Sequence, residues 1–300
     1  MKSSVAVLPP FLVLDQLLQS WLLEDIGRGD RTTQSLLSPN SARGQAKWIA
    51  KAPGIIAGLP VAARVFKLLN NEVDFISLTD EGTPSEPGQV IAEINGSLDT
   101  LLMGERVALN LVMRLSGIAS LTNIYVKKIA DLPAQLVDTR KTTPGLRILE
   151  KYATALGGAM NHRMGLDDAV MIKDNHIVAA GGIGEAVTRI RSHAPYPLTI
   201  EVETENLAQV REALQHKVDI IMLDNMSLSM MSEAVLLIRE EDSLVKIEAS
   251  GNVTLETVRA VAETGVDYIS TSAPITQSKW LDLSMRMVNC LNQDIHRLKD

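Results

Sequence analysis

The sequence is poor in the residues that mark several classes of protein. It has a single cysteine, Cys290, in 300 residues, which excludes a disulfide framework and favours a reducing compartment such as the cytoplasm. We expect that thiol to be a small apolar core side chain. Aromatic residues are 3% of the total, so the core must be built from aliphatic side chains and Met. The net charge of -7 offers no global positive field to nucleic acid or anionic lipid.

Long apolar runs are missing as well. No stretch approaches the roughly 18 unbroken apolar residues of a membrane helix. Residues 1–14 contain a short apolar run broken by Pro9 and Pro10, which does not resemble a signal peptide. With 46% hydrophobic and 22% charged residues, the composition is that of an ordinary globular protein of one large domain or two modest ones. We therefore expect neither a membrane nor a nucleic acid as partner.

The first third of the sequence mixes helical and strand-like patterns. Leu14, Leu18 and Leu22 recur at helical spacing and predict an amphipathic helix over 11–24. A long helical pattern follows over 97–130, and the glycines within it suggest that it is divided into two or three helices. The remaining expected elements are a strand over 46–52, a helix over 60–69 and a strand over 89–94.

From about residue 134 the pattern changes to short β-rich runs that alternate with helical ones. The runs are nearly continuous in apolar residues, which is typical of parallel strands covered on both faces. Repetition without a nucleotide-binding glycine fingerprint favours a β/α barrel, complete or partial, over a doubly wound sheet. The expected strands are 134–138, 169–173, 198–203, 219–224, 245–250 and 267–272, and the expected helices are 145–156, 181–193, 205–216, 227–240 and 254–263.

Polar residues recur where these strands end. In a β/α barrel the carboxyl ends of the strands meet at one mouth, and active sites lie there. A bland loop would supply Gly, Asn, Ser and scattered charge, whereas here charged residues appear at successive ends. They are Asp138 with Arg140 and Lys141, Lys173, Glu201 with Glu203, Asp224, Ser250 with Gly251, and Ser272.

The residue types at these ends indicate two chemistries. Guanidinium and ammonium groups bind carboxylates and phosphates, and Glu203 and Asp224 can hold a divalent cation or ribose hydroxyls. The turn at Ser250 and Gly251 offers backbone N–H groups to a phosphate. A phosphorylated sugar with Mg²⁺ and a second, carboxylated substrate would satisfy all three features. The expected cationic set is Arg140, Lys141, His162, Arg163 and Lys173.

These residues stand in motifs that closely resemble the quinolinate phosphoribosyltransferase family over nearly the whole chain. The most specific are DTRKTTPGLR (138–147), NHR (161–163) and KDNH (173–176) in this order, with EDIGRGDRTT (24–33) and GERVALN (104–110) before them. We give EDIGRGD a structural role, because nothing in it matches the needs of a substrate.

The resemblance implies both a fold and an activity. The expected fold is an N-terminal α/β sandwich-like domain (1–115), an incomplete, six- or seven-stranded α/β barrel (116–275), and a C-terminal helix (276–300) returning to the first domain. The implied enzyme is a decarboxylating phosphoribosyltransferase. It transfers phosphoribosyl from 5-phosphoribosyl-1-pyrophosphate (PRPP) to quinolinate, with Mg²⁺, and gives nicotinate mononucleotide, CO₂ and pyrophosphate. The implied assembly is a homodimer with a shared active site, or a higher oligomer.

Roles for individual residues follow from the resemblance. Lys141, Glu203 and Asp224 would be catalytic, and the two carboxylates would also be the ligands of the metal. Arg106, from the neighbouring subunit, would join the quinolinate site with Arg140, His162, Arg163 and Lys173. Lys141, Ser250, Gly251 and Ser272 would bind the phosphates of PRPP. The family pattern has Gly in place of Ser272 and a basic residue near Thr276 or Gln277, so the resemblance is weaker there.

Several alternatives stay open from the sequence. A paralogous pyrophosphorylase of the same fold would act on another carboxylated aromatic. An aldolase-like barrel would use Lys173 as a Schiff base, and a ligand-sensing dimer would have no turnover. Glu201 could replace Glu203 beside the metal, and His176 could brace Lys173 from behind.

Overall fold

The computed structural model describes residues 6–37 and 42–290, without the side chains of residues 289 and 290. The thiol of Cys290 therefore lies outside the described part. The chain forms two compact units. The parallel-sheet unit contains residues 122–147 and 158–277, and the antiparallel-sheet unit contains, of the described residues, 6–121, 148–157 and 278–290.

The parallel-sheet unit is built on six parallel strands in the order β6-β11-β10-β9-β8-β7. Among the described residues the two edge strands do not pair with each other, so the sheet is an incomplete barrel, as expected. The apolar strand residues are buried on both faces, which explains their nearly continuous hydrophobicity. The strands are β6 (Gln135–Val137), β7 (Val170–Ile172), β8 (Ile200–Thr204), β9 (Ile220–Asp224), β10 (Lys246–Ser250) and β11 (Tyr268–Ser270).

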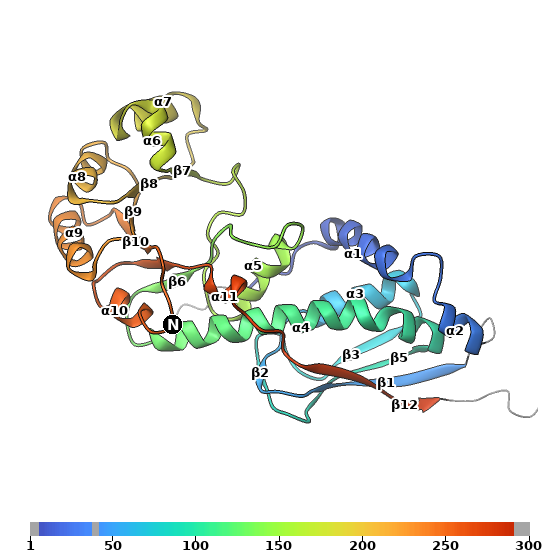
Figure 1. Cartoon of the computed structure of the whole chain (residues 1–300). Helices are drawn as coiled ribbons and strands as arrows, with labels where there is room; N and C mark the ends of the chain where they lie inside the picture. The colour runs from blue at the N-terminus through green and yellow to red at the C-terminus, as the bar shows by residue number, and fades with distance from the viewer. Residues whose placement is uncertain (1–5, 38–41, 291–300) are drawn as a thin grey trace, which may run out of the picture. The chain divides into compact units, whose positions relative to one another are not determined.

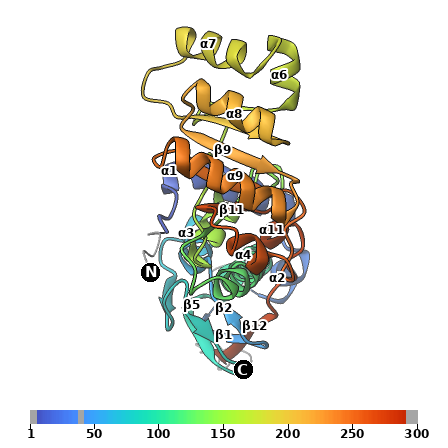
Figure 2. The ribbon, with the colours of Figure 1, turned by 90° about the vertical axis from the view of Figure 1, so that its left-hand side faces the viewer.

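Helices alternate with these strands and lie on their outer side (Figures 1 and 2). Two of them begin at side-chain caps that the sequence supplies: Asn206 accepts from the N–H groups of Ala208 and Gln209, and Ser227 accepts from that of Met230. The helices are α6 (Asp174–Ala180), α7 (Ile183–His193), α8 (Leu207–Gln215), α9 (Leu228–Glu241), α10 (Val258–Ala262) and α11 (Ala273–Thr276). The alternation predicted from the sequence is confirmed.

The antiparallel-sheet unit contains a four-stranded sheet in the order β12-β1-β5-β3 and a small β2–β4 pair. Few aromatic residues are available, and three of them meet here: the ring of Trp48 lies edge-on to those of Phe66 and Phe75, with centroids 6.3 and 5.6 Å away. The elements are α1 (Phe11–Ile26), α2 (Arg31–Leu36), β1 (Arg43–Ala50), β2 (Gly54–Ile55), α3 (Leu59–Leu69), β3 (Asp74–Ser77), β4 (Pro84–Ser85), β5 (Val90–Ser97) and α5 (Arg147–Leu156).

One helix, α4 (Leu98–Lys128), replaces the two or three helices expected over 97–130. Its glycines are points of close packing rather than breaks. A Cβ on Gly104 would lie 2.6 Å from the ring of Phe66, and a Cβ on Gly117 would lie 2.0 Å from the carbonyl oxygen of Lys279. The helix is long and apolar enough to cross a membrane, but 61% of its most apolar window is buried within the structure, as in the core helix of a globular fold.

The C-terminal segment also differs from expectation. We expected a helix over 276–300, but residues 283–290 form β12 (Leu283–Cys290), which pairs antiparallel with β1. The sequence of this segment agrees with a strand, because Leu283, Met285 and Met287 alternate with the polar residues at 284 and 286. The tail returns to the N-terminal part of the chain as a strand that completes its sheet.

Candidate active site

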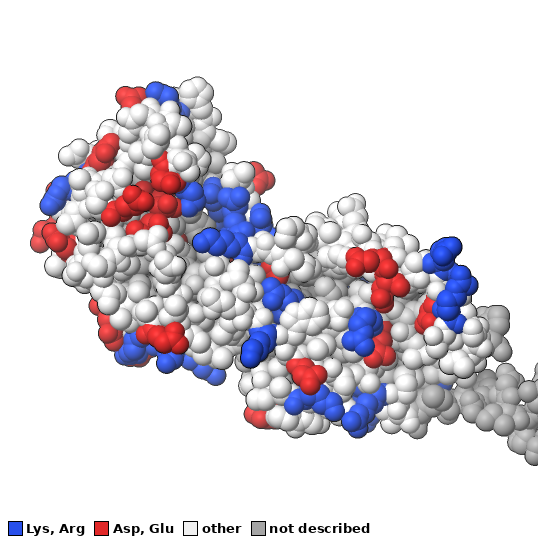
Figure 3. All heavy atoms as spheres, viewed as in Figure 1, with Lys and Arg blue, Asp and Glu red and all other residues white. Residues whose placement is uncertain are grey.

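A cavity of about 720 Å³ opens at the carboxyl ends of the six parallel strands. Its volume falls within the usual range for small-molecule sites. All the residues that line it belong to the parallel-sheet unit. Strands β7 to β11 contribute directly, and β6 contributes through the segment that follows it, residues 139–141. The predicted site residues on its wall are Arg140, Lys141, His162, Arg163, Lys173, Glu203, Asp224, Ser250, Gly251 and Ser272. In Figure 3 acidic and basic side chains form adjoining groups on this unit.

Two guanidinium groups form the cationic part of the wall. Arg163 donates from Nη1 to the carbonyl oxygen of Ala169 at 2.8 Å. Burial, and then the nearby charge of Arg140, lower the pKa of Arg163 from its ordinary value. Arg140 Nε is buried and makes no hydrogen bond. Two like charges held together, with a buried donor left over, favour an anionic ligand between them.

A buried carboxylate that the sequence analysis left without a role positions the loop of Arg163. Asp138, 3% exposed, follows β6 and accepts hydrogen bonds from the N–H of His162 at 2.8 Å and from Asn161 Nδ2 at 2.6 Å. Its position directly after a buried strand was the available signal. Asp138 thereby ties the loop 161–163 to the end of β6.

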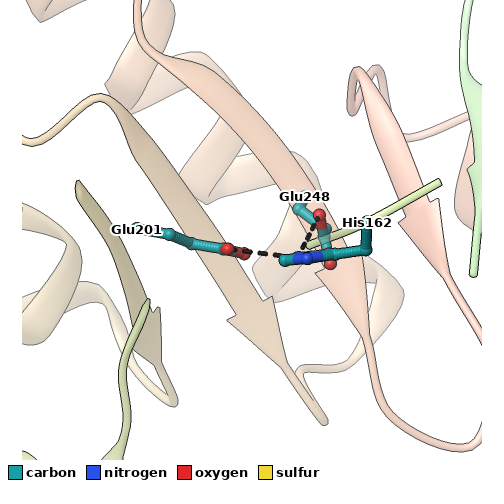
Figure 4. A group of neighbouring side chains, drawn as sticks. All are labelled: His162, Glu201 and Glu248. Atoms are coloured by element: carbon teal, nitrogen blue, oxygen red, sulfur yellow. Dashed lines mark ion pairs between the residues drawn. The ribbon is translucent and has the colours of Figure 1, made fainter. Parts of the chain in front are cut away.

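His162 is held differently from the expectation that it belongs to the cationic set. Its Nδ1 accepts a hydrogen bond from the N–H of Arg163 at 2.7 Å. A protonated imidazole would carry a hydrogen on that nitrogen, and two donors would then face each other. The geometry therefore favours the neutral ring, with its hydrogen on Nε2. That atom lies 3.1 Å from Glu201 Oε2 and 3.7 Å from Glu248 Oε2 (Figure 4).

Opposite charges meet directly at the next strand ends. The ammonium of Lys173 is paired with Glu203, and the N–H of Lys173 donates to His176 Nδ1 at 3.0 Å. His176 thus braces Lys173 from behind. Asp224 Oδ2 accepts from Asn225 Nδ2 at 2.7 Å, which orients that carboxylate at the end of β9. Glu203, not Glu201, reaches the cavity wall among the two glutamates of β8.

The turn after β10 is a place where only glycine fits. Gly251 has φ +98°, and a Cβ there would lie 2.3 Å from Asn225 Oδ1. The N–H of Asn225 donates to the carbonyl oxygen of Ser250 at 3.0 Å and holds the turns after β9 and β10 together. Ser272 follows β11 on the same wall.

Arg106 is the predicted site residue that the cavity does not include. It is exposed on α4 and belongs to the antiparallel-sheet unit. Conversely, Glu248 lies on the wall although the sequence analysis gave it no role. The signal was its position two residues before Ser250 on one strand, where residues alternate between the faces of the sheet.

Comparison with known proteins covers both units of this arrangement. Residues 30–116 match the family model of the N-terminal domain of quinolinate phosphoribosyl transferase, and residues 118–286 match that of its C-terminal domain. The chain belongs to the quinolinate phosphoribosyltransferase family.

Close relatives of the family cover nearly the whole chain. A protein of Synechocystis sp. named probable nicotinate-nucleotide pyrophosphorylase [carboxylating] is 61% identical over 94% of this chain and 95% of its own length. A Bacillus subtilis protein of the same name is 45% identical over 91% and 93%. The crystal structure of NadC from Streptococcus pyogenes has a TM-score of 0.88 and 41% identity, and the match covers 94% of this chain and 98% of that one.

Proposed function

We propose that the protein transfers the phosphoribosyl group of PRPP to the ring nitrogen of quinolinate, and that the adduct loses CO₂ to give nicotinate mononucleotide on the route to NAD. The observation that carries the proposal is the cavity at the strand ends. One wall presents the guanidinium groups of Arg140 and Arg163, with Arg140 Nε buried and without a hydrogen bond, and the other presents carboxylates. A dicarboxylate and a phosphorylated sugar are complementary to these two sets. The family to which the chain belongs supports the same reaction.

The roles of the wall residues follow from the charges that develop during transfer. Arg140 and Arg163 would bind the carboxylates of quinolinate, with His162 and Lys173 beside them. Departure of pyrophosphate leaves positive charge on the ribose, which Glu203 and Asp224 are placed to stabilise. Lys141 would compensate the charge of the leaving pyrophosphate.

The two carboxylates are also the proposed ligands of Mg²⁺. Carboxylate oxygens are the donors that Mg²⁺ prefers, and both side chains lie on the cavity wall. When bound there, the ion would neutralise charge on the pyrophosphate. Glu203, which contacts the ammonium group of Lys173, would hold the ion together with Asp224.

The decisive experiment is incubation of the purified protein with quinolinate, PRPP and Mg²⁺. Nicotinate mononucleotide, CO₂ and pyrophosphate should form in equal amounts. A parallel reaction with nicotinic acid tests the alternative of a paralogous pyrophosphorylase. We expect quinolinate to be strongly preferred, because the wall offers two guanidinium groups to the acceptor. Product from nicotinic acid alone would refute the proposal.

An aldolase-like activity at Lys173 is disfavoured because its side-chain nitrogen is engaged in an ion pair with Glu203. Borohydride treatment in the presence of a carbonyl substrate should therefore trap no adduct on Lys173.

We also propose a homodimer in which Arg106 completes the quinolinate site of the neighbouring subunit. Its exposure on α4 agrees with such a role. Arg106→Ala and Lys173→Ala should each be nearly inactive alone. Mixing them should restore about a quarter of the wild-type activity at most, because one site of each mixed dimer is intact. No recovery after confirmed subunit exchange would exclude the shared site. A cytoplasmic location is proposed from the scarcity of cysteine.

A further inference from the structure

Two buried glutamates lie side by side, and one of them, Glu248, reaches the wall of the cavity. Glu201 on β8 and Glu248 on β10 are each 3% exposed, and their nearest oxygens lie within 4.8 Å of each other. Oε1 of each carboxyl group is buried without a hydrogen-bond partner. Two ionised carboxylates in such a place repel each other and have lost their water. Such a pair requires a compensating proton or cation.

His162 stands between the two carboxyl groups but does not supply that charge (Figure 4). Because its Nδ1 accepts from the N–H of Arg163, its hydrogen is on Nε2, the atom that faces both glutamates. An Nε2 that carries hydrogen cannot be a metal ligand, although the three side chains are close enough together for a cation. The charges of Arg163 and Lys173 act on Glu201 and Glu248, respectively. A proton on one of the glutamates removes the repulsion that remains between the two.

The surroundings place this proton on Glu248 rather than on Glu201. Burial, and then the charge of Glu201, raise the pKa of Glu248 to about 7, while a hydrogen bond from Ser270 and the charge of Lys173 oppose that rise. Glu248 is also the member of the pair that reaches the cavity wall. A carboxylic acid that titrates near neutral pH is suited to general acid catalysis.

We propose that Glu248 is the acid that protonates carbon 2 of the pyridine ring after CO₂ has left. This inference rests on the proposed function and adds a catalytic residue to it. His162 and Glu201 act on Glu248 as positioning residues.

The bond between carbon 2 and the carboxylate breaks, and its electron pair stays on carbon 2 beside the quaternary nitrogen. The O–H bond of Glu248 then breaks, its pair stays on the carboxylate, and the new C–H bond uses the pair of carbon 2. Glu248 is left ionised beside Glu201 and regains a proton from water once the product leaves.

The test compares Glu248→Gln with its matched partner Glu201→Gln, measuring pyrophosphate and CO₂ separately from pH 5.5 to 9. Glutamine keeps the size of the side chain but has no acidic proton. In Glu248→Gln we expect CO₂ release to fall about 100-fold, the range of general acid catalysis. Pyrophosphate should still form in the first turnover, so that quinolinate mononucleotide accumulates.

The pH profiles give the signature that a structural role would not produce. In the wild type, CO₂ release should decrease as the pH rises through about 7, because the acid form of Glu248 is lost. Glu248→Gln should lack this decrease. Glu201→Gln should move it to lower pH, because removal of a neighbouring negative charge lowers the pKa of Glu248.

Three outcomes would overturn the inference while leaving the proposed function intact. They are wild-type CO₂ release by Glu248→Gln, equal loss of pyrophosphate and CO₂ release with an unchanged pH profile, and a stoichiometric metal ion that is lost only in the two glutamine variants. Thermal melting of both variants checks that they fold. A wild-type protein that makes no nicotinate mononucleotide would instead refute the proposed function.

Discussion

Replacing Arg163 with Ala should separate the binding of the two substrates. Truncating one partner of a buried charge pair costs about 2–5 kcal/mol. The lower end applies here, because Arg140 remains in the wall and becomes freer to bind the carboxylate once the neighbouring like charge is gone. A loss of about 2–3 kcal/mol corresponds to about 30- to 150-fold weaker quinolinate binding at 1.4 kcal/mol for each factor of ten. PRPP binding should change less than about threefold, because its phosphates are assigned to other strand ends.

The free energy of unfolding should change little in Arg163→Ala, since two effects oppose each other. The like-charge repulsion from Arg140 is relieved, and the carbonyl oxygen of Ala169 loses its donor. Calorimetric titration with each substrate measures the two affinities separately. Arg163→Lys is the control, because it keeps the charge without the planar guanidinium group. We expect the lysine variant to bind quinolinate with intermediate affinity. If both substrates lose affinity equally in Arg163→Ala, Arg163 is not a carboxylate clamp.

Three further changes test other parts of the structure. Gly251→Ala should weaken PRPP binding at least tenfold and leave quinolinate binding unchanged, because its Cβ would displace Asn225. Calorimetric titration of the variant with each substrate measures the two affinities. Gly117→Ala should lower the free energy of unfolding by about 1–3 kcal/mol, because its Cβ would clash with the carbonyl oxygen of Lys279. Denaturant titration measures this loss, and Leu102→Ala, at a 38% exposed position of the same helix, is the control that should have little effect. Chelation of Mg²⁺ should abolish activity, and Asp224→Asn should raise the Mg²⁺ concentration for half-maximal rate; an unchanged requirement would exclude Asp224 as a ligand.

Much of the parallel-sheet unit was predictable because apolar, strand-like runs alternate with helical patterns along the sequence. Six apolar runs, five of them followed by a helical pattern, gave all six strands and the helices α7–α10. The polar ends of those runs gave eight residues of the cavity wall, since the carboxyl ends of parallel strands meet, and the NHR motif gave His162 and Arg163.

Prediction from the sequence failed where contacts between distant segments determine the local structure. Glycine usually interrupts a helix, yet in α4 the absence of a side chain at Gly117 is what lets the backbone of residue 279 approach. The last segment forms β12 because it pairs with the edge of β1, a contact between distant segments that its short alternation of apolar and polar residues does not reveal by itself. The charge of His162 also escaped prediction, since the hydrogen bond that sets it comes from the backbone of the next residue.

The pairing of β12 with β1 has a consequence for synthesis of the chain. Residues 43–50 leave the ribosome well before their partner, residues 283–290. The antiparallel sheet cannot be finished until residues 283–290 have also been made, and until then β1 carries an open edge. Premature termination after the parallel-sheet unit would therefore leave the antiparallel-sheet unit unfinished and prone to aggregate.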